Sequence, residues 1–394
     1  MIRSLFKRSS VYFSGLALGR LLSTIVFILF ARTLLPEKFG SFIFFITLLQ
    51  VVTFFSDFGL NQWYQKRINH EEKNQLLGTV LKTRFYTLLI SFIASIFILK
   101  TTSFSSVDSI LFLLLLIPEA LLSIVDGYYL EKKQSLRVAI KTVSKMAILL
   151  IGYFVFVKTF SFDLAVRLYL FSSIITALWY FPWEKVSSAL TVRLKRVFSA
   201  IFLSRHYAFL IFTSFAYSRG DSLVIQYNLN SAALGLYGSA YRYLESLSLV
   251  PTALIHNLFP ISAKKEGVTF VQLLRITFIM GVLGFLVATL MYFWSNLLIV
   301  GLLGNAYISG ISLLHIFSFV LILFFINAPL NTVVQSSSLV NKFVPLGVAN
   351  TILNIALNLI FIPRYGIVTA AWVMLITEFS GLLIHIYFIR KLYS

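Results

Sequence analysis

Three arginines lie within stretches of sequence that are long and apolar enough to cross a membrane. Arg20 falls in residues 11–34, Arg219 in residues 207–228 and Arg242 in residues 235–258. A helical rise of about 1.5 Å per residue places them roughly 14, 18 and 11 Å from the starts of these stretches, inside a hydrocarbon layer about 30 Å thick. A charge at that depth costs several kcal/mol unless it faces a bundle interior or a wet cavity. Because guanidinium groups stay charged when buried and bind phosphate oxygens in bidentate fashion, these arginines are candidates for binding a phosphate-bearing substrate.

The alternative is that the arginines pair with acidic neighbours. Arg219 has Asp221 or Glu245 as a partner, and Arg242 has Glu245. Residues 219 and 221 point about 200° apart on a helix, so that pair is poor, whereas residues 242 and 245 share a helix face. We favour a substrate contact for Arg20 and Arg219, and leave Arg242 open between substrate and Glu245.

Four acids also fall within the apolar stretches: Glu119, Asp221, Glu245 and Glu378. Burial in a membrane favours the neutral form of a carboxylate, so one of them could take up a coupling proton. Neutralisation of a neighbouring arginine is the other interpretation, which we favour for Glu245. Asp221 and Glu378 stay open between coupling and charge pairing.

Asparagines recur every four residues near the C-terminus, at Asn350, Asn354 and Asn358. This spacing places them in one stripe along a helix. Their amides could bind polar groups of a substrate in a cavity, but hydrogen bonding between packed helices is the role we favour.

The composition is that of an integral membrane protein. The chain has 394 residues, of which 59% are hydrophobic and 12% charged, against roughly 25% charged in soluble domains. It contains no cysteine, no H-E-x-x-H motif and no phosphate-binding glycine loop. We therefore expect no metal site, no cofactor and no nucleotide-hydrolysing machinery.

The hydrophobic pattern predicts twelve transmembrane helices, each close to the ~20 residues that a span requires. The predicted spans are residues 11–34, 39–60, 83–99, 109–128, 138–157, 163–182, 207–228, 235–258, 276–295, 309–330, 343–362 and 367–388.

The distribution of positive charge predicts the topology and explains the net charge of +19. With the N-terminus inside, 24 Lys and Arg residues fall on the cytoplasmic side and six on the outer side. This is a strong positive-inside bias, so a nucleic-acid partner is unnecessary. Both termini are expected in the cytoplasm.

The chain also shows signs of an internal duplication. The segment around Gly40 leads from the first predicted helix into the second, and a similar segment around Gly235 leads from the seventh into the eighth. An offset of 195 residues aligns the two glycines and divides the chain into six-helix bundles at residues 1–195 and 196–394. Parallel repeats of this kind occur in transporters, with substrate sites near the middle of the membrane.

Three segments resemble a known family. RTLLPEKFGSFIFFITLLQVVTFFSDFGL (residues 32–60), SRGDSLVIQYNLNSAALGLYGSAYRYLESLSLVPTALIHNLFP (residues 218–260) and NTILNIALNLIFIPRYGIVTAAWVMLITEF (residues 350–379) are similar to regions of Wzx-type polysaccharide flippases. These belong to the multidrug/oligosaccharidyl-lipid/polysaccharide (MOP) superfamily. Thr369 departs from the pattern, since the family usually has Gly there. Asp57, within the first segment, could gate the outer mouth or stabilise a helix end.

The resemblance implies a flippase in the bacterial cytoplasmic (inner) membrane that moves a polyprenyl-diphosphate-linked oligosaccharide repeat by alternating access. Its product would serve O-antigen, lipopolysaccharide or capsule biosynthesis. The implied partners are the lipid-linked substrate, membrane lipids, and the glycan polymerase and chain-length proteins of the same pathway. The arginines would bind the diphosphate, and an ion gradient would drive transport.

Three other functions compete with this interpretation. A drug exporter of the same superfamily would need an acidic, aromatic cavity for cations, which three intramembrane arginines oppose. A membrane glycan polymerase or ligase would need a large outer loop, whereas the longest outer loop, near residue 104, spans only about ten residues by span length. A scaffold in a glycan-assembly complex would not need buried arginines. We therefore expect a transporter and not an enzyme.

Overall fold

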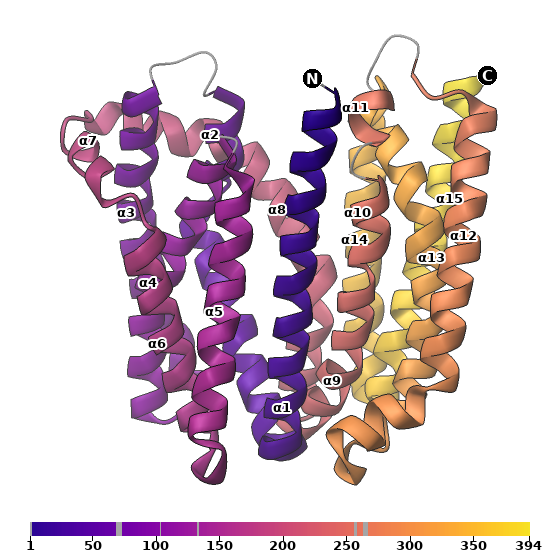
Figure 1. Ribbon diagram of the computed structural model, residues 1–394, viewed down its shortest axis with the longest axis horizontal. Helices are drawn as coiled ribbons and strands as arrows, with labels where there is room; N and C mark the ends of the chain where they lie inside the picture. The colour runs from indigo at the N-terminus through magenta and orange to yellow at the C-terminus, as the bar shows by residue number, and fades with distance from the viewer. Residues whose placement is uncertain (1, 68–72, 103, 132–133, 256–257, 263–266) are drawn as a thin grey trace. The chain divides into compact units, whose positions relative to one another are not determined.

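The computed structural model describes residues 2–67, 73–102, 104–131, 134–255, 258–262 and 267–394 (Figure 1). Across these residues the regular secondary structure is entirely helical, which confirms the predicted all-α class. The chain divides into two compact units, Met1–Val26 with Phe45–Phe215, and Phe27–Phe44 with Ala216–Ser394. We refer to them as unit 1 and unit 2. The division into six-helix bundles at residues 1–195 and 196–394 is inferred from the internal duplication, and it stays a prediction.

Unit 1 contains both ends of α1 (Ile2–Asp57) and the first part of α8 (Leu194–Asn228). Its other helices are α2 (Leu60–Arg67), α3 (Lys73–Leu99), α4 (Ser106–Glu131), α5 (Ser135–Val155), η1 (Val157–Thr159), α6 (Phe162–Tyr180), η2 (Trp183–Lys185) and α7 (Ser187–Leu190).

Unit 2 contains the middle of α1 and the last part of α8. Its other helices are α9 (Ser231–Leu247), α10 (Leu249–Ile255), α11 (Leu258–Ser262), α12 (Phe270–Phe293), η3 (Leu297–Gly301), η4 (Asn305–Tyr307), α13 (Gly310–Ser336), α14 (Val340–Tyr365) and α15 (Ile367–Tyr393).

Helix α1 contains the first two predicted spans and bends between them. Leu35 has φ 61° and ψ 168°, outside the helical region, and Pro36 follows it. A proline disfavours helical geometry in the residue before it and cannot donate its own backbone hydrogen bond, which accounts for the bend. The two arms then fold against each other, with the rings of Phe30 and Phe42 at 5.4 Å between centroids.

In the described part of the chain, ten helices are long and apolar enough to cross a membrane. The structure therefore is that of a multi-pass membrane protein. The difference from twelve has two causes. The two arms of α1 count as one helix, Ala17–Asp57, and the predicted span 235–258 is interrupted.

The interruption of the predicted span falls between α9 and α10. Helix α9 ends at Leu247, and Pro251 lies in the first turn of α10. Proline has no backbone N–H to donate to the carbonyl of residue 247, so one helical hydrogen bond is missing at this point. Residues 256 and 257 of the prediction lie outside the described residues. A second difference is the start of α8 at Leu194, well before the predicted residue 207.

Each unit has its own core. In unit 1, Leu60, Trp63 and Tyr64 of α2 pack in a buried cluster with residues of α3 and α4. In unit 2, α13 is the central helix, and it packs against α9, α11, α12 and α15. The side chains of Phe317 and Phe325 on α13 are fully buried, as expected for a helix at the centre of the unit.

The two glycines of the duplicated segments meet in unit 2. A Cβ added to Gly40 would lie 1.6 Å from the carbonyl oxygen of Ser231, and one added to Gly235 would lie 1.9 Å from that of Pro36. The offset of 195 residues relates Pro36 to Ser231 as it relates Gly40 to Gly235. The two contacts are thus equivalent under the predicted duplication, and they bring two helix backbones together as only glycine permits.

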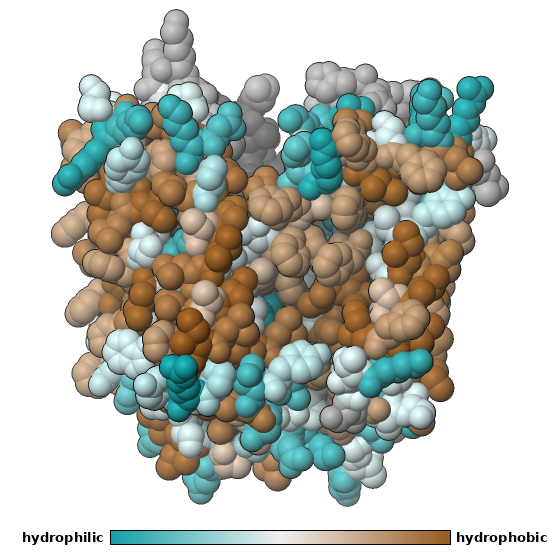
Figure 2. Space-filling view, turned by 180° about the vertical axis from the view of Figure 1, so that it is seen from behind, coloured by the Kyte–Doolittle hydropathy of each residue, from teal (hydrophilic) through white to brown (hydrophobic). Residues whose placement is uncertain are grey.

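Apolar side chains cover much of the surface. Figure 2 shows hydrophobic residues across the middle of one face and hydrophilic residues gathered toward its two ends. On α12, Phe278, Phe285 and Phe293 are between 59% and 75% exposed. Their spacing of seven and eight residues puts them on one side of the helix, as expected for a surface that faces lipid.

Candidate functional site

Two arginines in unit 2 share one glutamate. Arg219 Nη2 on α8 lies 2.8 Å from Glu245 Oε1, and Arg242 Nη1 on α9 lies 2.8 Å from Glu245 Oε2. The side chains of Arg219 and Glu245 are 20% and 17% exposed. The two guanidinium groups thus share one carboxylate. The pairing with Glu245 considered from the sequence is therefore present for both arginines.

Aromatic rings hold the two guanidinium groups in place. The Arg219 guanidinium carbon lies 5.6 Å from the centre of the Tyr241 ring, and that of Arg242 lies 4.2 Å from the centre of the Phe27 ring. The face of an aromatic ring carries partial negative charge, which attracts a cation without neutralising it. The residues named above form the arginine cluster: Arg219, Arg242, Glu245, Tyr241 and Phe27.

Arg20 lies on α1 in unit 1 and is half-buried. Arg219 and Arg242 both belong to unit 2. The structure thus brings two of the three predicted substrate-binding arginines together within one unit, and Arg20 belongs to the other.

Asp221 is buried on α8 and is held by hydrogen bonds. Its carboxylate accepts from the backbone N–H of Ser222 at 2.6 Å and from the hydroxyl of Tyr237 on α9. Arg219, two residues earlier, pairs with Glu245 instead, as the angular separation on the helix predicts. Asp221 therefore has neutral hydrogen-bond donors around it.

Glu378 on α15 is the centre of a second network in unit 2. Its carboxylate accepts from the hydroxyl of Tyr217 on α8, and Asn327 Nδ2 on α13 donates to its other oxygen at 3.0 Å. Asn327 Oδ1 lies 3.3 Å from His385 Nδ1. These hydrogen bonds join three helices through one carboxylate whose donors are neutral, an environment that suits a protonatable acid.

The asparagine stripe lies between α14 and α15. Asn354 Nδ2 donates to Thr377 Oγ1 at 2.9 Å, Asn358 Nδ2 donates to Asn354 Oδ1 at 3.0 Å, and Asn350 Nδ2 donates to the Thr377 carbonyl oxygen at 3.0 Å. The stripe thus forms hydrogen bonds between packed helices, the role favoured from the sequence.

A polar cluster in unit 1 was not anticipated. Arg84 on α3 pairs with Asp57 at the end of α1, and Lys145 on α5 pairs with Glu119 on α4. Arg84 and Lys145 are among the 24 basic residues predicted to lie on the cytoplasmic side, but both are buried inside helices. The sequence does contain a signal for the second pair. Glu119 and Lys145 lie well inside the consecutive predicted helices 109–128 and 138–157.

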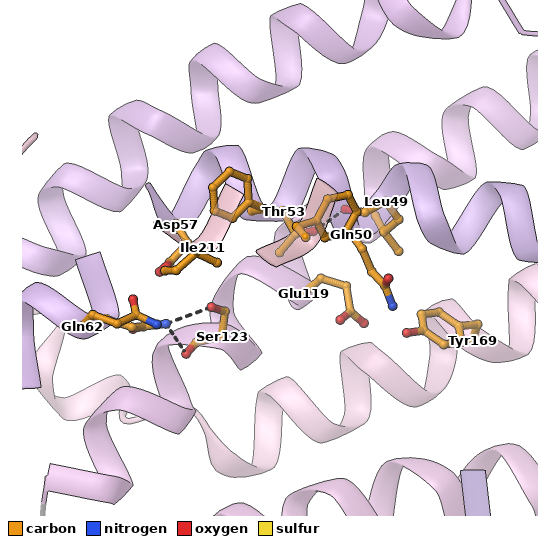
Figure 3. Close-up of a pocket in the computed structure, with 12 residues that line it drawn as sticks. Leu49, Gln50, Thr53, Asp57, Gln62, Glu119, Ser123, Tyr169 and Ile211 are labelled. Carbon is orange, nitrogen blue, oxygen red and sulfur yellow. Dashed lines mark hydrogen bonds between the residues drawn. The ribbon is translucent and has the colours of Figure 1, made fainter. Parts of the chain in front are cut away.

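These ion pairs border a cavity of about 350 Å³ in unit 1 (Figure 3). Asp57 and Glu119 line it together with the polar residues Gln50, Asn61, Gln62, Ser123 and Tyr169. The Asn61 amide is fixed by Ser123, donating to its carbonyl oxygen at 3.0 Å and to its hydroxyl at 3.1 Å. The volume of the cavity falls at the lower end of the roughly 300–1,000 Å³ typical of small-molecule pockets.

Residues 5–266 match the family model described as "Polysaccharide biosynthesis protein". The chain belongs to this polysaccharide biosynthesis family. No curated protein sequence matches it.

Solved structures of MOP superfamily members share the fold. The inward-facing form of a MATE multidrug resistance transporter of that superfamily aligns with a TM-score of 0.67 at 14% identity, covering 95% of each chain. The lipid II flippase MurJ in an inward closed conformation aligns with a TM-score of 0.68 at 16% identity, covering 96% of this chain and 87% of its own. The fold that the resemblance to the MOP superfamily implies is confirmed. At these identities the alignment establishes the fold alone.

Proposed function

We propose that this protein is a flippase that moves a polyprenyl-diphosphate-linked oligosaccharide repeat across the bacterial cytoplasmic membrane for surface polysaccharide biosynthesis. The observation that carries the proposal is the arginine cluster. Membership of the polysaccharide biosynthesis family supports the pathway, and the transporter fold supports movement across the membrane. The O-antigen or capsule repeat is the substrate class we propose.

The chemistry of the arginine cluster suits a diphosphate. Glu245 orients both guanidinium groups and is shared between them. A diphosphate offers several anionic oxygens, and guanidinium groups bind such oxygens through paired N–H donors. An arriving diphosphate would compete with Glu245 for Arg219, the more exposed of the two arginine side chains. The cluster therefore presents two oriented guanidinium groups to an anion.

A buried carboxylate would couple transport to an ion gradient. Asp221 and Glu378 are the candidates, because the donors around each are neutral. A carboxylate whose hydrogen-bond donors are neutral is easier to protonate inside a membrane than one in an ion pair. Alternating access would then require one state with this group protonated and another with it ionised.

The drug-exporter alternative differs in the charge that it needs. Organic cations would be repelled by the two guanidinium groups of the arginine cluster, and both carboxylates of the unit 1 cavity are already paired with bases. We propose lipid-linked glycan and membrane lipids as partners, with the polymerase and chain-length proteins of the pathway acting after transport.

Surface glycan in cells tests the proposal. A strain lacking the gene, supplied with the Arg219→Ala variant at normal membrane levels, should display no surface polysaccharide. Arg219→Lys should restore part of it, because lysine keeps the charge but loses the paired donors. Arg275→Ala is the control, since Arg275 is an exposed arginine of the same unit. Wild-type glycan display by Arg219→Ala would contradict the proposal.

A further inference from the structure

The cavity of unit 1 is lined by polar groups from four helices. Gln50 of α1, Gln62 of α2, Glu119 of α4 and Tyr169 of α6 all contribute to its wall. Figure 3 shows the polar ends of Gln50, Glu119 and Tyr169 gathered in one part of the cavity. Polar groups that converge from separate helices on one space form the kind of site that orients a ligand.

The charges of this cavity are balanced by its own residues. Glu119 Oε1 accepts from Lys145 and, at 2.7 Å, from the hydroxyl of Ser173. Asp57 Oδ1 accepts from Arg84. Because each carboxylate has a basic partner, the wall carries no surplus charge near these pairs. The cavity therefore favours a neutral ligand over an ion.

The hydrogen-bonding capacity of the cavity exceeds what the protein uses. Among the described residues, the side-chain amides of Gln50 and Gln62 have no hydrogen-bond partner, and neither has Glu119 Oε2. Each amide offers two donors and one acceptor oxygen, and the carboxylate oxygen accepts. Groups of this kind match vicinal hydroxyls, each of which donates one hydrogen bond and accepts others.

Apolar surface lies next to these polar groups. The rings of Phe54 and Phe215 are stacked, with centroids 6.4 Å apart and planes 11° from parallel, and both line the cavity with Leu49 and Ile211. A sugar ring has hydroxyls at its edge and C–H groups on its faces, so it can use both kinds of wall.

We propose that this cavity in unit 1 binds a neutral sugar of the transported glycan through Gln50 and Gln62. The inference rests on the proposed function and assigns to unit 1 the recognition of sugar, a role separate from diphosphate binding by the arginine cluster. The volume of about 350 Å³ suits a mono- or disaccharide portion of the repeat.

Equilibrium binding to the purified full-length protein in nanodiscs tests this inference. The two probes are undecaprenyl diphosphate and the lipid-linked oligosaccharide extracted from cells that lack the gene. Gln50→Ala and Gln62→Ala should each weaken binding of the glycan-bearing lipid about fivefold, the effect of one lost hydrogen bond, and leave undecaprenyl diphosphate unaffected. Gln65→Ala is the matched control, because Gln65 is exposed on the same helix as Gln62 but does not line the cavity.

Chemical labelling gives an independent readout. The chain contains no cysteine, so Gln62→Cys and Gln65→Cys each introduce a single thiol for maleimide labelling. The glycan-bearing lipid should slow labelling at position 62 and leave position 65 unchanged, and undecaprenyl diphosphate should protect neither.

The outcomes separate this inference from the proposed function. Equal affinity of the wild-type protein for both lipids, or equal weakening of both by the glutamine variants, would overturn the sugar site alone. Failure of the wild-type protein to bind either lipid would overturn the sugar site and the flippase proposal together.

Discussion

Glu245 is the residue on which the arginine cluster depends. Each of its carboxylate oxygens binds one guanidinium group at 2.8 Å. Removal of the carboxylate therefore leaves two partly buried positive charges without their common partner. Replacement of one arginine, by contrast, leaves a complete ion pair. The cluster should thus respond more strongly to loss of the acid than to loss of either base.

We predict that Glu245→Gln lowers the free energy of unfolding by about 3 kcal/mol, the cost of leaving a buried charge unpaired. A thermal melt of the detergent-solubilised protein measures the effect as a lower melting temperature. The double variant Glu245→Gln/Arg242→Met should recover part of the loss. Glu37→Gln is the control, because Glu37 is an exposed acid of the same unit. A melting temperature for Glu245→Gln equal to that of wild type would show that the carboxylate does not stabilise the cluster.

Prediction at the residue scale depends on how far apart the partners lie in the sequence. Helix geometry made the pair of Arg242 and Glu245 foreseeable, because these residues are three apart on one helix. Lys145 and Glu119 lie on different helices, and their meeting depends on how α4 and α5 rotate about their axes. Hydrophobic patterning does not determine that rotation when most of a helix surface is apolar.

At the scale of elements, the bent helix α1 packs its middle segment on α9 through two glycines. The contact between Gly40 and the carbonyl oxygen of Ser231 leaves no room for a methyl group. The close approach joins a turn of each duplicated segment. It also explains why residues 27–44 belong to unit 2 while the rest of α1 belongs to unit 1.

We predict that Gly40→Ala destabilises the protein by about 1–3 kcal/mol, because the α1 and α9 backbones must move apart. Gly347→Ala is the matched control. Gly347 lies inside α14 with nothing within 4 Å of a Cβ, so alanine there should be neutral or slightly stabilising. Thermal melts of both variants provide the comparison. Equal melting temperatures would refute the proposed close packing at Gly40.

The interruption between α9 and α10 shows the limit of prediction at this scale. Hydropathy alone joins residues 235–258 into one span, but Pro251 prevents the hydrogen bond that a continuous helix needs. The proline was visible in the sequence. A proline leaves one backbone carbonyl of the preceding turn without its hydrogen bond. Whether the helix bends or ends there depends on whether neighbouring helices can donate to that carbonyl, and tertiary packing determines this.

At the scale of the whole molecule, the distribution of charge predicts the orientation in the membrane. Basic residues outnumber acidic ones by 33 to 14, and they concentrate in the loops predicted to be cytoplasmic. Reporter fusions measure this directly. A reporter at the C-terminus, after Ser394, should give a cytoplasmic signal, and reporters at Ser105 and Asn305 should give periplasmic signals. The reverse pattern at these sites would overturn the predicted topology.

Reconstituted flipping of a lipid-linked glycan tests the central claim most directly. Proteoliposomes that contain the full chain and a polyprenyl-diphosphate disaccharide with a fluorescent sugar are treated with an impermeant quencher under an imposed pH gradient. The wild-type protein should expose the inner-leaflet fluorophore to quenching faster than protein-free vesicles, and Arg219→Ala should not. Arg275→Ala should behave as wild type. Quenching by the wild-type protein no faster than in protein-free vesicles, or undiminished quenching by Arg219→Ala, would contradict the account.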